Sequence, residues 1–297
     1  MTAEIILLGR SGQVATAVAS LASSTGRTIR QLARPDFDFA RPDSIAPVLE
    51  PVLAAATPGS VVVNATAYTD VNRAEVEPEL AHTINALAPG ILAGQCEQAG
   101  LPLIHLSTDY VHDGTKGEPY VETDPCNPLG VYGRTKLAGD EAVQGSGARH
   151  VILRTAAVYS ATGKNFVRTM LELGRRQDRV QVVSDQRTNP TAAADIAVAI
   201  LAIADQLTSQ TSDSGLFHFC GDAAASWADF ATEIFDIAAG LGERPVQVER
   251  IAAKDFPSPA RRPACSVLDC GAIADRFSIP QPDHREALVR AITGILA

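Results

Sequence analysis

The chain has 297 residues, of which 46% are hydrophobic and 20% are charged, a composition ordinary for a globular protein with a sizeable core. Its formal net charge of -9 argues against a nucleic-acid-binding protein, because duplex affinity depends largely on Lys and Arg that neutralise phosphates. A local positive site would still suffice for a small phosphate-bearing ligand. The five cysteines form no CxxC pair, so we expect free thiols rather than a disulfide framework or a zinc site.

The start of the chain, MTAEIILLGRSG, lacks the basic segment and long apolar stretch of a signal peptide. No stretch reaches the roughly 18 uncharged apolar residues that a membrane span needs. We therefore expect a cytoplasmic protein without a membrane partner.

The first half of the chain alternates short apolar runs with Ala-rich helical patterns. The runs are nearly continuous, which is typical of strands buried on both faces of a parallel sheet. They are Ile5–Leu8, Val61–Val63, Leu103–Leu106 and Val151–Leu153, and the expected helices are Gln13–Ala22, Pro78–Ala99 and Tyr132–Gln144. This alternation predicts right-handed βαβ crossovers and an α/β fold with a doubly wound parallel Rossmann sheet.

After about residue 155 the pattern loosens. Helices are expected at 165–176, 192–207, 226–239 and 284–296, with strand-like runs at Val180–Val183 and Leu216–Cys220. We therefore divide the chain into a Rossmann domain over 1–155 and a region over 156–297 that mainly binds substrate. The second region is smaller and mostly helical, and some of its segments are expected to return to the Rossmann core.

A glycine-rich turn follows the first strand directly. Glycines at a strand-to-helix turn let the backbone approach a pyrophosphate, which then lies at the helix N-terminus. The position before an amphipathic helix favours a dinucleotide site over a plain glycine-rich turn. The spacing GxxGxxA, completed by Ala15, matches short-chain dehydrogenases. The predicted cofactor residues of this turn are Gly9, Arg10, Ser11, Gly12, Gln13 and Val14.

The end of the second strand, near Ile29–Arg34, indicates which dinucleotide is bound. An acidic residue there favours the ribose of NAD, whereas arginine accommodates the 2'-phosphate of NADP. Arg30 and Arg34 flank this strand end, so NADPH is favoured, while Asp36 and Asp38 leave NADH open. Asp38 is alternatively expected to reach the adenine.

Tyr132 and Lys136 form a YxxxK pair on one helix face, and chance predicts only about 0.07 such pairs in this sequence. Thr108 follows a strand at the carboxyl edge where open sheets bind ligands. A ketone that accepts hydride needs a proton, and a phenol with a pKa of about 10 is a poor acid or base at neutral pH. The lysine ammonium is expected to lower that pKa and to hold the nicotinamide ribose. Thr108 is expected to donate a hydrogen bond to the carbonyl.

The next polar segment ends another strand and is expected to lie beside the nicotinamide ribose. Its predicted cofactor residues are Asn64, Ala65, Thr66 and Tyr68. Asn85 lies within a predicted helix, where asparagine is mildly unfavourable, so we expect it to make an anchoring hydrogen bond rather than to act in catalysis.

Together, these segments resemble the dTDP-4-dehydrorhamnose reductase family of the extended short-chain dehydrogenases. The matching pieces span nearly the whole chain: GRSGQVA, VVNATAYTDVNRAE, HLSTDYVHDGTKGEPYVETDPCNPLGVYGRTKLAGDEAV, LRTAAVY, NFVRTML, DQRTNPT and ARRPACSVL. The resemblance implies reduction of the C4 ketone of a dTDP-4-keto-6-deoxysugar by NADPH, giving dTDP-L-rhamnose.

The resemblance also implies that Tyr132 is the proton donor, Lys136 its partner and Thr108 the carbonyl-binding residue. The substrate residues it implies are Val71, Thr108, Asp109, Ala157, Asn165, Arg187 and Arg262. Arg262 is interpreted as a bidentate clamp on the diphosphate.

Several positions depart from the family pattern. Ala157 stands where a pocket tryptophan is common, His112 replaces the usual phenylalanine, Asn72 the usual aspartate, and Arg187 a small or aromatic residue. These changes keep a second hypothesis open, namely a 4-ketoreductase for another dTDP-deoxysugar of secondary metabolism.

Some members of the family form dimers bridged by Mg²⁺ through carboxylates. The matching positions here are Ala17 and Ala194, and alanine offers no oxygen ligand to a hard cation. We therefore expect no metal site and a monomer or weak dimer.

Two further readings are less favoured. One is an epimerase or dehydratase of the same superfamily; a dehydratase would place a second acidic residue after the catalytic threonine and Asp109, where this chain has Tyr110. The regulatory subunit of methionine adenosyltransferase resembles the same family without acting as a reductase. The intact set of Thr108, Tyr132 and Lys136 argues against that role, because function depends on the site and not on the fold.

Overall fold

The computed structural model describes residues 4–209 and 214–297, and the predicted parallel sheet is present. Six parallel strands are ordered β2-β1-β3-β4-β5-β10. Their bounds are β1 (Ile5–Leu8), β2 (Ile29–Leu32), β3 (Val61–Asn64), β4 (Leu103–Thr108), β5 (His150–Thr155) and β10 (Gly215–His218). The strand order reverses between β1 and β3, and open α/β sheets bind their ligands at such a switch point.

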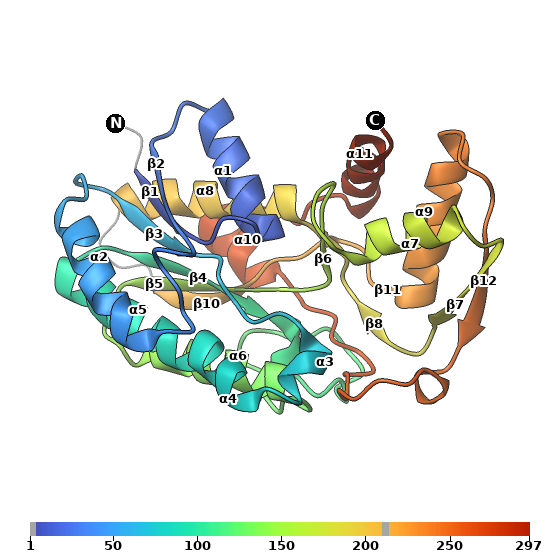
Figure 1. Ribbon diagram of the computed structural model, residues 1–297, viewed down its shortest axis with the longest axis horizontal. Helices are drawn as coiled ribbons and strands as arrows, with labels where there is room; N and C mark the ends of the chain where they lie inside the picture. The colour runs from blue at the N-terminus through green and yellow to red at the C-terminus, as the bar shows by residue number, and fades with distance from the viewer. Residues whose placement is uncertain (1–3, 210–213) are drawn as a thin grey trace.

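Helices cover both faces of the sheet, giving three layers (Figure 1). One face carries α1 (Gln13–Ser24), α8 (Ala193–Ser209) and α10 (Gly271–Phe277), and the other carries α2 (Ile45–Ala54), α5 (Ala88–Ala99) and α6 (Val131–Gln144). Successive strand residues point to opposite faces: Ile5 and Leu7 join the core against α1 and α8, whereas Ile6 and Leu8 join the core against α2 and α5. Burial on both sides explains why the strands are continuous apolar runs.

The predicted helix over Pro78–Ala99 is not one regular helix. It consists of α4 (Pro78–His82), a π-helical turn η2 (Thr83–Leu87) and α5. Pro89 has no N–H to donate to the carbonyl of Asn85 four residues earlier, so the regular hydrogen-bond ladder is interrupted at this point. The predicted helical segment is therefore present over its full length, but it contains a π-helical turn that was not predicted and that includes Asn85.

A second hydrophobic core lies at the far end of the molecule from β2 (Figure 1). It is built from α7 (Phe166–Gly174), α9 (Trp227–Gly240) and α11 (His284–Leu296), together with the parallel strands β7 (Arg179–Val183) and β12 (Gln247–Ile251). These helices match the expected ones closely, whereas β12 was not predicted.

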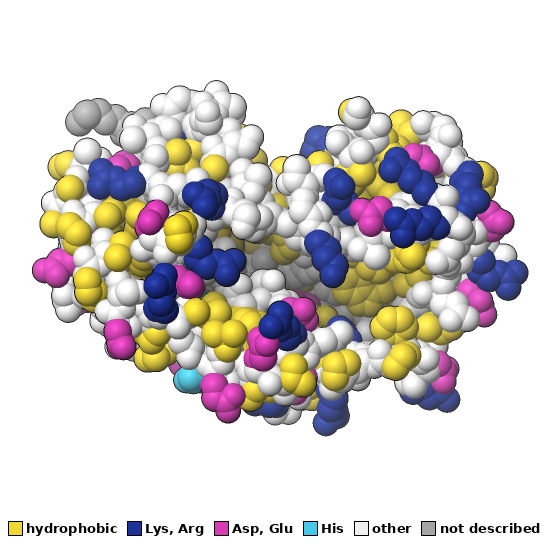
Figure 2. Space-filling model, viewed as in Figure 1, with side chains coloured by type: hydrophobic (Ala, Val, Ile, Leu, Met, Phe, Trp, Pro, Cys, Tyr) yellow, Lys and Arg dark blue, Asp and Glu magenta, His cyan; other side chains and the backbone are white. Residues whose placement is uncertain are grey.

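The remaining elements are short. They are α3 (Val71–Ala74), the strand pairs β6 (Val158–Tyr159) with β9 (Thr191–Ala192) and β8 (Arg187–Thr188) with β11 (Ala225–Ser226), and the 3-10 turns η1 (Pro42–Ser44), η3 (Asp109–Val111) and η4 (Ala253–Asp255). Three elements of the second half, α8, β10 and α10, belong to the Rossmann layers. Figure 2 shows the surface hollowed between the two lobes. No helix in the described part of the chain is both long enough and apolar enough to cross a membrane.

Candidate active site

The glycine-rich turn between β1 and α1 is held tightly at the carboxyl edge of the sheet. Gly9 has φ +113°, and a side chain there would also bring its Cβ 3.3 Å from the carbonyl oxygen of Ala65. The Gly9 amide donates to Leu32 O at 2.9 Å, and its carbonyl accepts from Gln31 Nε2 at 2.8 Å. Only glycine both adopts this positive φ without strain and leaves room for the Ala65 carbonyl oxygen. The turn therefore lies close to its neighbours and leaves the N-terminus of α1 open.

A cavity of about 670 Å³ lies over this turn, within the usual range of about 300–1,000 Å³ for ligand pockets. Most of the predicted cofactor residues line it, namely Gly9, Arg10, Ser11, Gly12, Arg34, Asp38, Ala65, Thr66 and Tyr68. The lining combines backbone N–H groups at a helix start with arginine side chains, which is the donor set that a dinucleotide phosphate requires. These residues therefore fit the expected cofactor.

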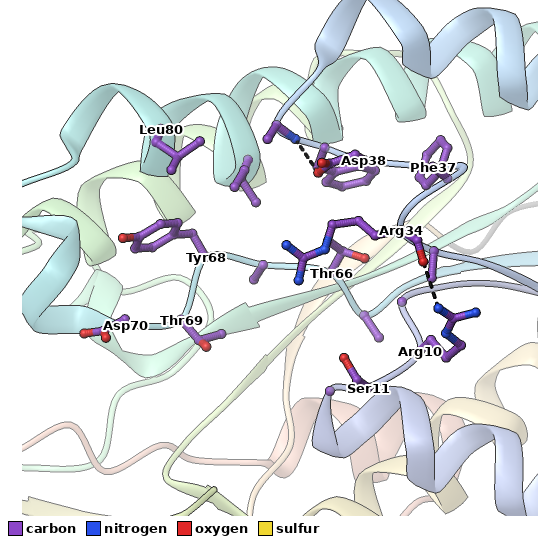
Figure 3. Close-up of a pocket in the computed structure, with 18 of the residues that line it drawn as sticks. Arg10, Ser11, Arg34, Phe37, Asp38, Thr66, Tyr68, Thr69, Asp70 and Leu80 are labelled. Atoms are coloured by element: carbon purple, nitrogen blue, oxygen red, sulfur yellow. Dashed lines mark hydrogen bonds between the residues drawn. The ribbon is translucent and has the colours of Figure 1, made fainter. Parts of the chain in front are cut away.

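Arg10 and Arg34 lie beside the glycine-rich turn, whereas a third lining arginine, Arg73, is paired with Glu77. The Arg10 Nη2 donates to the Arg34 carbonyl oxygen at 2.8 Å, and Figure 3 shows the Arg34 guanidinium extending across the middle of the cavity near Thr66. Asp38 uses its Oδ1 to accept a hydrogen bond from the Ala40 amide at 3.0 Å. Arg30 is paired with Glu4 at 3.1 Å instead, so Arg10 and Arg34 are the candidates for a 2'-phosphate.

Five predicted cofactor residues do not line this cavity; two of them, Tyr132 and Lys136, lie on α6 and are described below. Gln13 turns toward the C-terminal half, where its amide donates to Val158 O at 3.3 Å and accepts from Ser160 Oγ at 2.8 Å. Val14 packs against the core beneath the sheet. Asn64 is fully buried and contacts His105.

Sequence reasoning missed the aromatic and acidic parts of the cavity wall. Phe37 and Phe39 line it on either side of Asp38, with ring centroids 5.4 Å apart. At the other end, Tyr68 Oη donates to Glu77 at 2.5 Å. The sequence signal for the aromatic pair is the alternation Phe-Asp-Phe after the second strand, whereas the Tyr68–Glu77 contact depends on how α4 packs.

The proposed catalytic side chains come from two neighbouring elements. Thr108 is the last residue of β4, and Tyr132 and Lys136 lie one turn apart on α6. Two glycines allow α6 to approach the helical turns η3 and η2 closely. A Cβ on Gly133 would come 2.2 Å from Tyr110 O, and one on Gly139 would come 2.0 Å from Asn85 O.

Burial raises the pKa of the Tyr132 phenol, and its hydrogen bond with Thr108 opposes this effect. The expected lowering by Lys136 is therefore absent from this structure, because burial disfavours the phenolate more strongly. The consequence suits a reduction, in which the phenol has to be protonated before it can give up its proton.

Lys136 is almost completely buried. Its Nζ donates to Leu106 O at 2.7 Å and lies 3.3 Å from His105 Nε2. Burial lowers the pKa of Lys136 to about 8, while Asp140 acts in the opposite direction. His105 was not predicted as a site residue, because a single histidine inside an apolar strand carries no local pattern.

Thr108 and Asp109 connect the site to the C-terminal half. The Thr108 hydroxyl donates to Asp109 Oδ1 at 3.1 Å and accepts from the Tyr110 amide at 3.2 Å. Asp109 is buried and also accepts hydrogen bonds from Ser266 and Thr188. Burial raises the pKa of Asp109 to about 6 despite these bonds.

Asn85 makes the anchoring hydrogen bonds that were expected of it. Its side chain accepts from the Tyr68 amide at 2.8 Å and donates to Tyr68 O and to Thr135 Oγ1, both at 3.1 Å. It therefore links the loop after β3 to α6, which carries the YxxxK pair.

Two of the predicted substrate residues lie near the same edge. Val71 begins α3, and Arg262 donates to Asn72 Oδ1 at 3.1 Å and to Ser258. Burial raises the pKa of Tyr110 to about 12, and the charge of Arg262 opposes this effect. The Tyr110 ring packs edge-on against Tyr132 at 5.9 Å.

The other predicted substrate residues have structural partners of their own. Asn165 caps α7 by accepting from the Arg168 amide, and its NH₂ donates to Ser160 O at 2.8 Å. Ala157 has φ +41°, which is uncommon for a residue other than glycine. Arg187 is exposed and donates to Ala224 O at 3.3 Å.

Ala17 lies in α1 and Ala194 in the first turn of α8. Asp195, the carboxylate next to Ala194, is paired with Arg290 at 2.8 Å. Among residues 4–209 and 214–297, no group of three or more His, Cys, Asp or Glu side chains is arranged to hold a metal ion.

Comparison with known proteins gives concordant results. The family model described as "RmlD substrate binding domain" matches residues 3–296. The chain is 40% identical to a dTDP-4-dehydrorhamnose reductase of Sinorhizobium fredii, covering 98% of this chain and 97% of the relative. It is 33% identical to the Escherichia coli K12 enzyme of that name, covering 97% and 96%.

Solved structures agree in fold. A dTDP-4-dehydrorhamnose reductase from Clostridium acetobutylicum superposes with a TM-score of 0.89 at 31% identity, covering 99% of this chain and 100% of that chain. One from Bacillus anthracis, in complex with NADP, has a TM-score of 0.89 at 29% identity, covering 99% of both chains.

Proposed function

Because this chain belongs to the dTDP-4-dehydrorhamnose reductase family, we propose that it reduces the C4 ketone of dTDP-4-dehydrorhamnose to an alcohol, giving dTDP-L-rhamnose. The observation that carries the proposal is the arrangement of Thr108 at the carboxyl end of β4 and Tyr132 on α6, where burial raises the pKa of the Tyr132 phenol and so favours its protonated form. A ketone placed between these two hydroxyl groups would receive both hydrogen bonds at its oxygen.

NADPH supplies the hydride when it is bound. On this proposal, Thr108 turns its hydroxyl from Asp109 to the substrate oxygen, and Tyr132 gives its proton to that oxygen as charge develops. Lys136 keeps its place through the hydrogen bond to Leu106 O and presents its remaining N–H groups toward the cofactor site. The substrate gains one hydride at carbon and one proton at oxygen, so the step balances.

The cofactor residues support NADPH. The backbone N–H groups of the turn Gly9–Gly12 would hold the pyrophosphate at the start of α1, and Arg10 and Arg34 would pair with the 2'-phosphate. On this proposal residues 1–155 hold the cofactor and the catalytic groups, whereas 156–297 mainly bind the sugar nucleotide and contribute α8, β10 and α10 to the Rossmann layers.

For the substrate, we propose that Val71 and Arg262 contact the nucleotide portion. The present acceptors of Arg262 are Asn72 and Ser258, and both are neutral. A diphosphate would replace them with charge-assisted hydrogen bonds, which are roughly twice as strong as neutral ones. The chemistry therefore favours release of these contacts when the sugar nucleotide binds.

A second candidate is a 4-ketoreductase of another dTDP-deoxysugar, and Ala157 favours it. This residue stands where the family commonly has tryptophan, and its small side chain leaves the pocket wall open. Its left-handed backbone also directs the chain after β5 differently from an extended strand.

We further propose that Mg²⁺ does not bridge two copies of this chain, which would be a monomer or weak dimer. Ala17 and Ala194 supply no carboxylate, and the neighbouring Asp195 is already paired with Arg290.

The test is NADPH oxidation by the purified chain, with dTDP-4-dehydrorhamnose made enzymatically and the product identified by chromatography and mass spectrometry. Turnover to dTDP-L-rhamnose is expected. Turnover only with other 4-keto sugars would favour the second candidate. NADPH binding without turnover on any of them would reject the reductase and favour a regulatory role.

A further inference from the structure

Within the described residues, the helix that carries Tyr132 and Lys136 lacks a capping side chain of its own. The N-cap position of α6 is Gly130, and the first turn of the helix holds no acidic residue. The first amides of an α-helix have no partner within the helix, and an N-cap side chain usually accepts from one of them. Tyr132 is the second residue of α6, so its position depends on how this first turn is held.

A glutamate from another element supplies the acceptor. Oε1 of Glu75 accepts a hydrogen bond from the Val131 amide at 2.7 Å, across 56 positions of the sequence. A carboxylate suits this place, because the positive end of the helix dipole favours a negative charge. Glu75 follows α3 directly, and its own amide donates to Asn72 O at 3.3 Å. The backbone of the glutamate is therefore held by the short helix α3.

Gly130 leaves room for this contact. Its φ is -121°, which any residue can adopt, so the backbone conformation does not require glycine here. A Cβ at this position would, however, come 2.8 Å from Oε1 of Glu75. The lack of a side chain at the N-cap is therefore what admits the carboxylate to the start of α6.

Apolar packing joins the same two elements. Val131 is buried in a small cluster with Ala74 and Ala81, and the rings of Tyr68 and Tyr132 pack against this cluster. Two contacts of different kinds, one polar and one apolar, therefore connect α3 with the first turn of α6. The polar contact is the directional one, because a hydrogen bond weakens steeply as its angle departs from linearity.

We propose that Glu75 is a positioning residue, which caps α6 from outside the helix and thereby holds the Tyr132 phenol where it meets the substrate ketone. The inference rests on the proposed function, because it gives Glu75 a role in the proposed reduction. Lys136 lies one turn further along and is anchored separately through Leu106 O. Loss of the cap should therefore displace the proton donor more than the lysine.

The position of α3 connects this cap to the proposed substrate contacts. The helix begins with Val71, and Asn72 accepts a hydrogen bond from Arg262 at 3.1 Å. Release of Arg262 by a diphosphate, as proposed above, would occur only three residues before Glu75. One short helix therefore joins the proposed nucleotide contacts to the residue that positions the proton donor.

The cap is tested without substrate by amide hydrogen exchange, followed by NMR of protein labelled with ¹⁵N-valine. The Val131 amide should be protected in the unaltered protein and exchange about fivefold faster or more in Glu75→Ala. Glu75→Gln should keep most of the protection, because the amide oxygen of glutamine still accepts. Equal exchange at Val131 in the unaltered protein and in Glu75→Ala would overturn the proposal.

The effect on turnover is tested by steady-state kinetics. Glu75→Ala should lower kcat by about 5- to 30-fold, the factor that corresponds to loss of a helix cap. kcat/KM should fall by the same factor, because the proton donor acts in the transition state, and NADPH affinity should stay nearly unchanged. Glu75→Gln should recover most of kcat. Glu79→Ala is the matched control, because Glu79 is an exposed glutamate of the neighbouring α4, and it should keep kcat.

A structural role alone would give a different result. A lower melting temperature of Glu75→Ala with unchanged kcat would overturn the proposal, and so would a loss of kcat in Glu75→Gln as large as in Glu75→Ala. Gly130→Ala is an independent variant that keeps Glu75, while its added methyl group displaces the carboxylate. It should speed exchange at Val131 and lower kcat together, and faster exchange with unchanged kcat would reject the positioning role.

The two hypotheses fail separately. Absence of turnover in the unaltered protein would reject the proposed function. Hydrogen exchange at Val131 would still decide whether Glu75 caps α6, because that measurement depends on neither substrate nor cofactor.

Discussion

The hydroxyl of Ser266 donates a hydrogen bond to the carboxylate of Asp109, at 2.5 Å and across 157 positions of the sequence. Thr188 donates to the same oxygen at 3.3 Å. The residue that follows Thr108 is thus held by two segments of the C-terminal half. Because Asp109 is also the acceptor for Thr108, the orientation of the proposed carbonyl-binding hydroxyl depends on contacts that the Rossmann strands alone do not provide.

Asp109→Asn should change how stability depends on pH. Burial raises the pKa of Asp109 to about 6, so folding favours the protonated carboxyl. Its contribution to the free energy of unfolding is fully present below the ordinary pKa near 3.8 and is lost as the pH rises through about 6. The native protein should therefore lose about 3 kcal/mol more than Asp109→Asn over that range.

Urea denaturation at a series of pH values measures this difference. Asp113→Asn is a control of opposite sign, because hydrogen bonds from Asn127 and Thr115 lower the pKa of Asp113. Its contribution is lost as the pH falls. Identical pH profiles for the native protein and Asp109→Asn would show that Asp109 does not titrate in this way.

Tyr132→Phe should lower kcat by a factor of about 10²–10⁴, the usual contribution of a positioned proton donor. NADPH affinity should stay nearly unchanged, because the ring and its packing against Tyr110 are kept. Steady-state kinetics and fluorescence titration measure the two effects separately. Tyr110→Phe is the matched control and should keep most of kcat, and a fully active Tyr132→Phe would remove Tyr132 from the proton-donor role.

Arg34→Asp should shift preference from NADPH toward NADH. The change removes a charge that would pair with the 2'-phosphate, and a hydrogen bond to a charged group contributes about 1.5–3 kcal/mol. The ratio of kcat/KM for the two cofactors should therefore fall by tenfold or more. Arg41→Asp is a suitable control, because Arg41 is in the same segment and donates to Pro35 O instead. An unchanged ratio would assign recognition of the 2'-phosphate to another residue.

Ala157→Gly should stabilise the protein by about 1 kcal/mol, because glycine adopts positive φ without the steric cost that alanine bears. Thermal unfolding measures the change. Ala156→Gly is the control and should destabilise, because Ala156 is buried and has no positive φ. Destabilisation by Ala157→Gly would mean that the methyl group packs well enough to outweigh the strain.

Activity should survive prolonged treatment with EDTA. Hard divalent cations require several oxygen ligands, and the relevant positions are Ala17 and Ala194. The assay compares initial rates before and after treatment and after addition of Mg²⁺. Loss of activity that Mg²⁺ restores would refute the proposal that the chain works without this metal.

The parts of the fold that were predictable from sequence are those encoded in neighbouring residues. Burial on both faces makes β1, β3, β4 and β5 apolar runs, and the glycine-rich turn and YxxxK spacing are local patterns. The π-helical turn at Asn85 was not predicted, although Pro89 gives a local reason for it. The partnership of β7 with β12 joins segments whose pairing has no local signal.

The site was predictable to the same extent. The turn residues and Arg34 do line one cavity, but Gln13 and Asn64 face elsewhere, because strand register and packing determine their direction. His105 is placed opposite Asn64 by the pairing of β3 with β4. The raised pKa of Tyr132 reflects burial, which no spacing of residues reveals.

The two glycines of α6 have a consequence for engineering the pocket. Gly133 and Gly139 pack directly against the backbone carbonyl oxygens of Tyr110 and Asn85. These main-chain contacts therefore set how closely α6 approaches the rest of the domain. Side-chain changes at Ala157 or Arg187 leave these main-chain contacts of α6 unchanged. Libraries that randomise these two positions should therefore yield variants with altered sugar preference and an unaltered proton donor, whereas enlarging either glycine would displace Tyr132 and Lys136 together.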